Sequence, residues 1–170
     1  MKFILAATEH LQDMCRITSE AKAQLKGLGI DQWQKGYPSE AIWAEDIQNK
    51  AAWLAMDSGK VLGTFAFQTV PDASYDVIDG KWLTDWPYAS MHRVCVSVDS
   101  KGRGVAGAMF QHGFSMAKSL GFRSLRIDTH PENLPMQRAL NKAGFVSCGT
   151  IILKGGSEDG DARIAFERIL

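Results

Sequence analysis

The stretch Lys101-Gly102-Arg103-Gly104-Val105-Ala106-Gly107 follows the apolar run Val94-Cys95-Val96-Ser97-Val98 and opens a segment of helical apolar spacing through Leu120. This order predicts a strand, a glycine-rich basic turn and a helix. The first N–H groups of a helix carry partial positive charge, and glycine lets a phosphate approach the backbone closely. The sequence therefore indicates an anion-binding turn directly before this helix.

Two other phosphate-binding motifs are alternatives for this turn. A Walker loop requires Lys-Ser or Lys-Thr after its last glycine, and neither pair follows here. A dinucleotide-binding turn fits the spacing Gly102-x-Gly104-x-x-Gly107, and Asp128 supplies the acidic residue expected about 20 positions on. However, a hairpin expected at 51–69 precedes the turn, whereas a Rossmann domain places its phosphate turn after its first strand.

Composition and charge limit the classes of protein to consider. The chain has 170 residues, which fits one domain over 1–170, and its 19 basic and 19 acidic residues give a net charge of zero. No overall field attracts it to nucleic acid or to a membrane, and no apolar stretch has membrane-spanning length. The three cysteines, Cys15, Cys95 and Cys148, lack zinc-type spacing, so we expect no metal site and a reduced, cytoplasmic location.

The apolar periodicity and the turn residues predict the remaining elements. We expect strands at 2–7, 51–56, 61–69, 91–98, 125–128, 148–153 and 162–169, and helices at 11–25, 39–49, 104–120 and 133–143. The stretch 71–88 is aromatic but irregular, which is typical of a long loop or a broken strand. The acidic residues from Glu158 to Asp161 are expected to form a solvated turn in the last hairpin.

Several motifs together resemble the GNAT superfamily of acetyl-CoA-dependent N-acetyltransferases. The family motif Gln/Arg-x-x-Gly-x-Gly/Ala corresponds to the stretch that starts at Lys101, with lysine in the first position. Asn133-x-x-Met136 and the later pair Gly144-Phe145 resemble its second motif. Further likeness lies in Ala6–Leu11, Gln32–Pro38 and Met91–Arg93, so the resemblance extends over essentially the whole chain.

The resemblance implies an α+β fold. It has a mixed, mostly antiparallel sheet of six to seven strands, flanked by about four helices and split between strands 4 and 5. Acetyl-CoA is expected in the split, with its pantetheine arm bonded to the main chain of Val96 and Val98 and near Asn133. Its pyrophosphate is expected on the helix start and two basic side chains: Lys101, Arg103, Gly104, Val105, Ala106, Gly107 and Ala108.

Direct attack of an amine on the thioester needs orientation, a donor for the oxyanion and a proton for the leaving thiolate. The Val96 N–H is the expected oxyanion donor. Cys95 is the less favoured alternative as a nucleophile, because buried strand cysteines are common. The family often has a tyrosine in the last helix that acts as general acid toward the thiolate, and Leu140 occupies that position here.

Three residues are candidates for catalysis. His92 is a candidate proton shuttle because imidazole titrates near neutrality, and it shares strand parity with Val94 and Val96 unless a bulge intervenes. Asp128 and His130 are candidates to orient the amine. The structural alternatives are a backbone-bonded His92, an Asp128 paired with a nearby arginine, and a solvated His130.

Trp33, Gln34 and Tyr37 are expected to form the acceptor wall, because the first two helices of the family cover that side of the split. Aromatic faces there shield an amine from water and attract a cation. The alternative is ordinary packing of the connection between the helices.

The leading functional hypothesis is transfer of an acetyl group from acetyl-CoA to a primary amine of a small molecule or amino acid. The absent tyrosine leaves a catalytically weak acyl-CoA-binding regulator or sensor as an alternative. A protein or peptide N-acetyltransferase is a third hypothesis, which the aromatic segments 33–37 and 75–88 disfavour because they suggest a closed pocket. We expect no nucleic-acid or membrane partner, and a homodimer through the C-terminal strands stays open.

Overall fold

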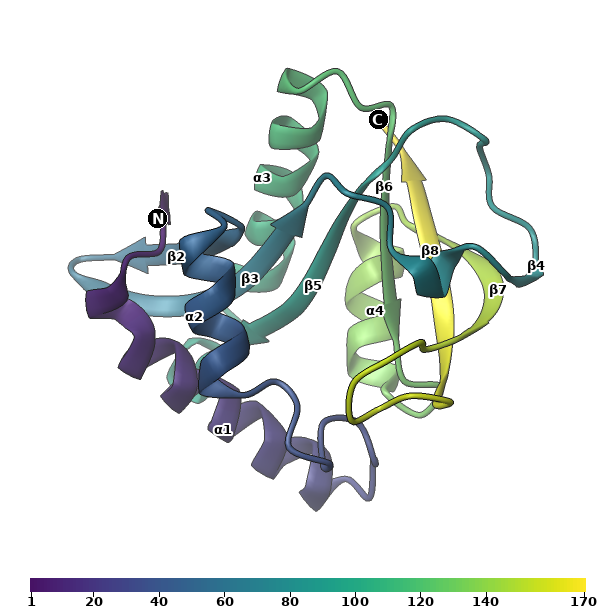
Figure 1. Ribbon diagram of the computed structural model, residues 1–170. Coiled ribbons are helices and arrows are strands. Elements are labelled where there is room, and N and C mark those ends of the chain that lie inside the picture. The colour runs from purple at the N-terminus through teal and green to yellow at the C-terminus, as the bar shows by residue number, and fades with distance from the viewer.

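The computed structural model describes residues 1–170 and contains one eight-stranded sheet in the order β1-β2-β3-β5-β6-β8-β7-β4 (Figure 1). The strands are β1 (Lys2–Leu5), β2 (Ala52–Asp57), β3 (Lys60–Gln68), β4 (Asp79–Gly80), β5 (Ala89–Val96), β6 (Ser124–Thr129), β7 (Val146–Ile152) and β8 (Ala162–Ile169). Every neighbouring pair is antiparallel except β5 and β6. The sheet is therefore mixed and mostly antiparallel, as the resemblance implied, and the two-residue β4 brings the strands to eight.

Four helices cover the two faces of the sheet: α1 (Leu11–Gly27), α2 (Glu40–Gln48), α3 (Val105–Ser119) and α4 (Leu134–Lys142). Helices α1 and α2 lie on one face, over β2, β3 and β5, and α3 and α4 lie on the other (Figure 1). The predicted start of α2 is confirmed, since the Ser39 Oγ accepts a hydrogen bond of 3.3 Å from the Ile42 N–H. No helix is both long enough and apolar enough to span a bilayer. The cytoplasmic location remains a prediction from the sequence.

The segment between β3 and β5 is mostly irregular, as expected. It contains a short 3-10 turn, Ala73–Tyr75, and the two residues of β4, which pair with β7 at the edge of the sheet. The two hairpins predicted at 51–69 and 148–169 are both present. The segment after β3 lies against the face of β8 that is opposite α4 (Figure 1).

Two apolar cores lie on opposite faces of the sheet. The core under α3 and α4 contains Phe65, Phe110 and Phe166, and the core under α1 and α2 contains Met14 and Trp43, all of them 0% or 1% exposed. Burial of one such side chain contributes about 1.5–3 kcal/mol to folding. The core under α3 and α4 contains residues of β3, β5, β6 and β8, whereas the core under α1 and α2 takes its strand residues from β2, β3 and β5.

The split lies between β5 and β6. These strands pair only at Ala89↔Leu125 and Ser90↔Arg126, beside the start of each strand, and diverge beyond that point. In β5 the single residue Phe65 of β3 faces two residues, Arg93 and Val94, which defines a β-bulge. Arg93 has a φ of 54°, so its backbone is left-handed at the bulge.

The bulge also changes which side chains share a face of β5. Val94 and Val96 pack against the core under α3, whereas Cys95 belongs to the core under α1. Simple alternation placed His92 with the two valines unless a bulge intervened. The bulge does intervene, and it places His92 on the Cys95 face, opposite Val94 and Val96.

Candidate functional site

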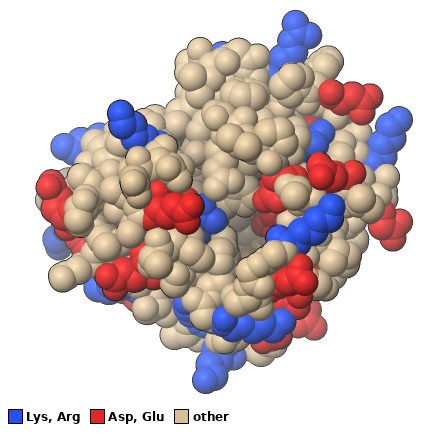
Figure 2. Space-filling model, in the orientation of Figure 1, with Lys and Arg blue, Asp and Glu red and all other residues tan.

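A cleft of about 730 Å³ occupies the split in the sheet. Its walls come from the connection between α1 and α2, from β5 and β6, from the starts of α3 and α4, and from the loop between β7 and β8. In the space-filling view a hollow opens near the centre of the face, with acidic and basic side chains around it (Figure 2). The candidate site thus lies where the sheet cannot close.

The start of α3 forms one end of the cleft. Gly104 is the N-cap residue with a φ of 76°, and no side chain caps this helix. The first helical backbone bond joins the Ala108 N–H to the Gly104 carbonyl at 3.0 Å, so the N–H groups of Val105, Ala106 and Gly107 have no helical partner. An added Cβ at Gly102, Gly104 or Gly107 meets no atom within 4 Å. Free donors facing open space fit a pyrophosphate group.

The predicted basic side chains lie at the edge of this end. The Lys101 ammonium contacts the Gln24 side-chain oxygen, and the Arg103 Nη2 lies 3.6 Å from Asp57 Oδ2 with 54% of its side chain exposed. Val105 turns its side chain into the core, whereas Ala106 lines the cleft. The turn therefore presents backbone donors, with two basic side chains beside them.

The main-chain groups of Val96 and Val98 differ in their partners. Ser97 donates to the Leu62 carbonyl of β3 at 2.9 Å, so by strand alternation the Val96 N–H and C=O point away from β3 and into the split. The Val98 N–H instead donates to the Glu20 carboxylate at 3.0 Å, and its C=O accepts from Lys101. Of these two residues, only Val96 offers free backbone groups to the cleft.

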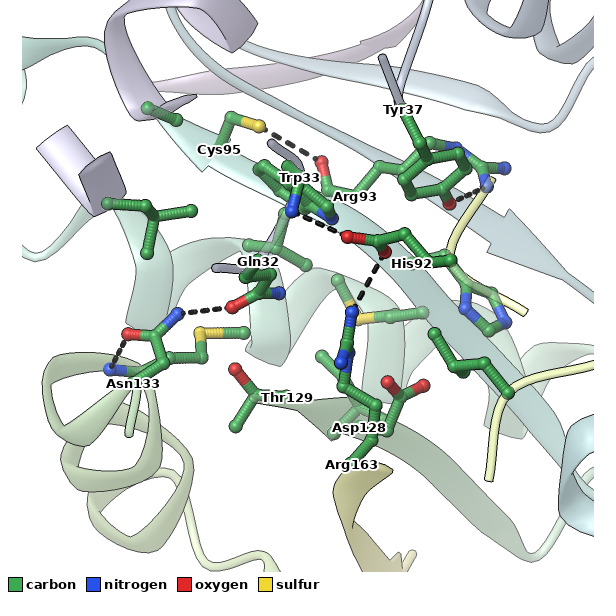
Figure 3. A pocket seen from close by; sticks show the side chains of 18 of the residues that line it. Gln32, Trp33, Tyr37, His92, Arg93, Cys95, Asp128, Thr129, Asn133 and Arg163 are labelled. Atoms are coloured by element: carbon green, nitrogen blue, oxygen red, sulfur yellow. Dashed lines mark hydrogen bonds and ion pairs between the residues drawn. The ribbon is translucent and has the colours of Figure 1, made fainter. Parts of the chain in front are cut away.

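Asn133 connects two walls of the cleft. Its side-chain oxygen accepts from the Met136 N–H at 3.2 Å and caps α4, as the sequence predicted. Its amide donates to the Gln32 side-chain oxygen at 2.9 Å (Figure 3). The sequence motif thus holds the start of α4 against the connection between α1 and α2.

Asp128 lies inside the cleft at the end of β6. Its Oδ1 accepts a hydrogen bond of 2.7 Å from the Tyr75 hydroxyl rather than from an arginine. Burial raises the pKa of Asp128 to about 6, although the Tyr75 hydrogen bond and the nearby Arg163 act in the opposite direction. This carboxyl group can therefore accept a proton near neutral pH. Tyr75 itself is 3% exposed, and burial holds its pKa well above the usual value.

The two candidate histidines lie in different surroundings. His92 lines the cleft, with its Nε2 3.0 Å from Ser90 Oγ and 3.7 Å from Asp72 Oδ2. Burial and the Arg93 charge lower its pKa to about 4, so the neutral-pH titration that suggested a proton shuttle is absent. His130 does not line the cleft, and its Nδ1 accepts from the Glu132 N–H at 3.1 Å in the loop after β6.

The structure separates Cys95 and Leu140 from the chemistry. Burial raises the pKa of the Cys95 thiol to about 12, so the thiolate that a nucleophile requires is not formed near neutral pH. Leu140 is 0% exposed within the core under α3 and α4. It is a packing residue at the position where the family often has a tyrosine.

Two of the three residues predicted for the acceptor wall line the cleft. Trp33 and Tyr37 line the cleft and meet edge to face, with their ring centroids 6.5 Å apart (Figure 3). Gln34 does not line it, because its amide donates to the carbonyls of Lys22 and Gln32. Trp33 has a φ of 65°, a left-handed conformation that costs a bulky residue energy.

The acidic turn of the last hairpin is solvated only in part, because Asp159 is exposed as predicted but Glu158 is not. Glu158 is 5% exposed, and its Oε1 accepts a hydrogen bond of 2.6 Å from the Trp33 N–H. Its Oε2 lies 2.9 Å from the Arg163 Nη2 of β8 (Figure 3). The expectation was wrong for Glu158 because a charged residue in a glycine-rich loop gives no local sign of a partner far along the chain.

Arg93 and Tyr75 were also absent from the predicted site. Arg93 forms two hydrogen bonds of 2.8 Å to Asp46 of α2 and one of 2.7 Å to the Tyr37 hydroxyl. The only sequence signal for Arg93 was the Met-His-Arg strand within the resemblance, and Tyr75 lay in a segment without periodicity. Both act through contacts between distant segments.

With this geometry in view, comparison with known families is decisive. The family model described as acetyltransferase (GNAT) family matches residues 11–145. This chain belongs to the GNAT family of acetyltransferases. The match includes the α3 start, Asn133 and the residues Gly144-Phe145, on which the resemblance rested.

Solved structures agree with the family assignment. A GNAT family acetyltransferase from Streptococcus agalactiae 2603 is 32% identical, with 99% of this chain and 95% of that chain covered and a TM-score of 0.88. A GNAT family acetyltransferase from Listeria monocytogenes 4b F2365 is 16% identical, with 99% and 94% covered and a TM-score of 0.72.

A ribosomal-protein-alanine N-acetyltransferase from Brucella melitensis is 15% identical, with 100% of both chains covered and a TM-score of 0.72. At this level of identity the likeness concerns the fold. Among curated proteins, none matches this chain.

Proposed function

We propose that this acetyltransferase takes its acetyl group from acetyl-CoA and transfers it to the primary amine of a small molecule or amino acid by direct attack. The observation that carries the proposal is the continuity of one cleft. It joins the free N–H groups at the start of α3 to Asp128 and the Trp33 wall. Two substrates held along one cleft gain the proximity that direct transfer needs.

At the donor end, bound acetyl-CoA would supply the activated acetyl group, and the α3 start would hold its pyrophosphate. Backbone donors at a helix start suit this anion, with Lys101 and Arg103 as additional cations. The free main-chain groups of Val96 are suited to the pantetheine arm, and its N–H is the donor we assign to the developing oxyanion. Val98 contributes to the same task only if its N–H releases Glu20.

At the acceptor end, Asp128 is the group we assign as general base. Its pKa of about 6 leaves it mainly ionised at neutral pH, so it can take a proton from the amine as the carbon–nitrogen bond forms. Tyr75 holds the carboxylate in place through its hydrogen bond. The carbon–sulfur bond breaks, and water protonates the leaving thiolate. Leu140 has no acidic proton to donate, and His92 is neutral.

The geometry of the loops supports a small acceptor over a protein chain. The Trp33 N–H bonds to Glu158, and Lys35 bonds to Asp161 at 2.7 Å, so two loops meet across the acceptor end. A peptide would have to separate both contacts before it entered. Only Leu140 supports the sensor hypothesis, since it is the one position where a group that the family often uses for acetyl transfer is missing.

The test is calorimetric titration with acetyl-CoA, followed by a panel of amines, amino acids and peptides assayed for release of free thiol. Binding of acetyl-CoA with turnover of small amines supports the proposal. Binding without any turnover supports the sensor instead, and turnover of peptides alone supports the third hypothesis. Absence of binding by the folded protein would contradict the donor assignment.

A further inference from the structure

The charged side chains that line the cleft fall into groups already paired within the protein and groups left free. The cations are Lys35, Arg93, Lys101, Lys154 and Arg163, and the carboxylates are Asp72, Asp128 and Glu158. A carboxylate on the acceptor would need a cation that is not already neutralised, whereas an ammonium group would need an unpaired carboxylate. The pairing of each group therefore bears on the class of acceptor.

The charge of Arg93 is already paired within the protein. Its Nε and Nη2 donate to the two oxygens of Asp46, and its Nη1 donates to the Tyr37 hydroxyl. The side chains of Arg93 and Asp46 are each 8% exposed, so this bidentate pair is shielded from water. The charge of this guanidinium is therefore already balanced by Asp46, and each of its nitrogens already donates one hydrogen bond within the protein.

Arg163 is neutralised as well. It is 2% exposed, its Nη1 donates to the Ala162 carbonyl at 2.9 Å, and its Nη2 lies 2.9 Å from Glu158 and 3.9 Å from Asp161. The Arg163 Nη2 and the Glu158 Oε2 are close, but they are not aligned as a hydrogen bond. Glu158 therefore balances the positive charge of Arg163 without accepting a hydrogen bond from its Nη2. The loop between β7 and β8 thus supplies the carboxylate that this arginine requires.

The three lysines do not serve the acceptor end. Lys35 pairs with both oxygens of Asp161, and Lys101 lies beside the α3 start at the opposite end. Lys154 lines the cleft but is exposed, so its ammonium group stays solvated by water. None of them offers a desolvated cation beside Asp128.

Two carboxylates have no cationic partner of their own. Asp128 is bonded only to the neutral Tyr75 hydroxyl, and the charge of the nearby Arg163 is already matched by Glu158. Asp72 lies 3.7 Å from His92, which is neutral because its pKa is lowered to about 4. The interior of the cleft is therefore electronegative, which attracts an ammonium group and repels a carboxylate.

The uncharged part of the lining includes apolar and aromatic side chains beside polar ones. Trp33, Tyr37, Met91 and Leu153 belong to the apolar and aromatic part of the same cleft. Such a surface suits a hydrocarbon or aromatic group attached to the amine.

We propose that the acceptor is a primary amine with an apolar or aromatic group and without a carboxylate beside its amino group. The proposal rests on the function proposed above for the reaction itself, and it narrows the acceptor from amines and amino acids to simple amines. The carboxyl side of an amino acid would meet Asp128 and Asp72, and the buried cations of the cleft, Arg93 and Arg163, are already paired with Asp46 and Glu158.

The test compares two matched pairs, phenethylamine with phenylalanine and tryptamine with tryptophan, by kcat/KM for thiol release at saturating acetyl-CoA. Each pair differs only in the carboxylate, so we expect the amine to be preferred at least about tenfold. The same four compounds are titrated by calorimetry in the presence of coenzyme A. This second readout decides the acceptor class even if no turnover occurs.

A charge-removing variant tests the cause. Glu158→Gln keeps an oxygen for the Trp33 N–H but removes the nearer carboxylate from Arg163, so the preference for the amine should fall at least about tenfold. Asp161→Asn is the matched control on the same loop, because it lies 3.9 Å from Arg163 and is bonded to Lys35. We expect its preference to stay within about twofold of wild type.

The outcomes separate the two levels of the proposal. Preference for the amine in turnover or in binding supports the inference, and binding without turnover contradicts only the proposed reaction. Equal or greater use of the amino acids overturns the inference and shows that Arg163 accepts the carboxylate of the acceptor. Binding of neither member of either pair also overturns it, and an unchanged ratio in folded Glu158→Gln contradicts the charge-pairing argument.

Discussion

The two ends of the cleft are built in different ways. At the start of α3, the consecutive residues Val105, Ala106 and Gly107 present backbone N–H groups that have no helical partner. At the acceptor end, Trp33 bonds to a residue 125 positions away, and Tyr75 bonds to Asp128 across 53 positions. One end depends on the local backbone, and the other depends on side chains that only the fold brings together.

This difference teaches how each end can fail. A site of backbone donors is damaged when a side chain is added at the site, because only substitution by proline removes a backbone N–H itself. A site of side chains is damaged when one is removed or loses its hydrogen-bond partner. The predictions below test this contrast, beginning with the largest expected effect.

The substitution Gly104→Glu adds a negative side chain at the α3 start, where the structure leaves open space. We expect the affinity for acetyl-CoA to fall by at least about 100-fold, or about 2.7 kcal/mol, because the carboxylate repels the pyrophosphate. Calorimetric titration measures the change. Gly121→Glu is the control, since Gly121 has a φ of 83° and equally open space beyond the other end of α3. Equal loss in both variants, or none in folded Gly104→Glu, contradicts the contrast.

The substitution Asp128→Asn removes the proposed base at the acceptor end. We expect kcat to fall by about 100- to 1,000-fold while the dissociation constant of acetyl-CoA stays unchanged, because general-base catalysis contributes effects of this size. Thiol release and calorimetry measure the two quantities. A large loss of acetyl-CoA affinity would show that the two ends are not separable, and an unchanged kcat would remove Asp128 from the mechanism.

The substitution Tyr75→Phe removes the hydrogen bond that lowers the pKa of Asp128. Activity requires the ionised carboxylate, so the kcat/KM of the wild type should decline as pH falls through about 6. Without the tyrosine hydroxyl the pKa rises further, and the acidic limb of the profile should move to higher pH. A lower kcat/KM with an unmoved limb would show a purely structural role for Tyr75.

The substitution Arg103→Ala should have the smallest effect. Its side chain is 54% exposed and only 3.6 Å from Asp57, so we expect acetyl-CoA to bind about three- to fivefold more weakly. The deficit should shrink as salt is added, because salt screens exposed charges. A loss as large as that of Gly104→Glu would show that side-chain cations, rather than backbone donors, dominate this end.

The sequence by itself determined the features that are local along the chain. Alternation and periodicity predicted the strands and helices, the glycines from Gly102 to Gly107 predicted the α3 start, and Asn133 predicted the cap of α4. The motifs also predicted the family. These features follow from neighbouring residues, because helix starts, caps and turns are set by bonds within a few positions.

Only the tertiary structure decided which side chains face the acceptor and with what charge. The bulge at Arg93 turned His92 to the other face, and packing brought Tyr75 to Asp128 and Glu158 to Trp33 and Arg163. A pKa or an ion pair depends on which groups lie within a few ångströms and on how little water remains there. Tyr75 and Asp128, which are 53 positions apart, and Trp33 and Glu158, which are 125 positions apart, become neighbours only when the sheet and its loops close around the split.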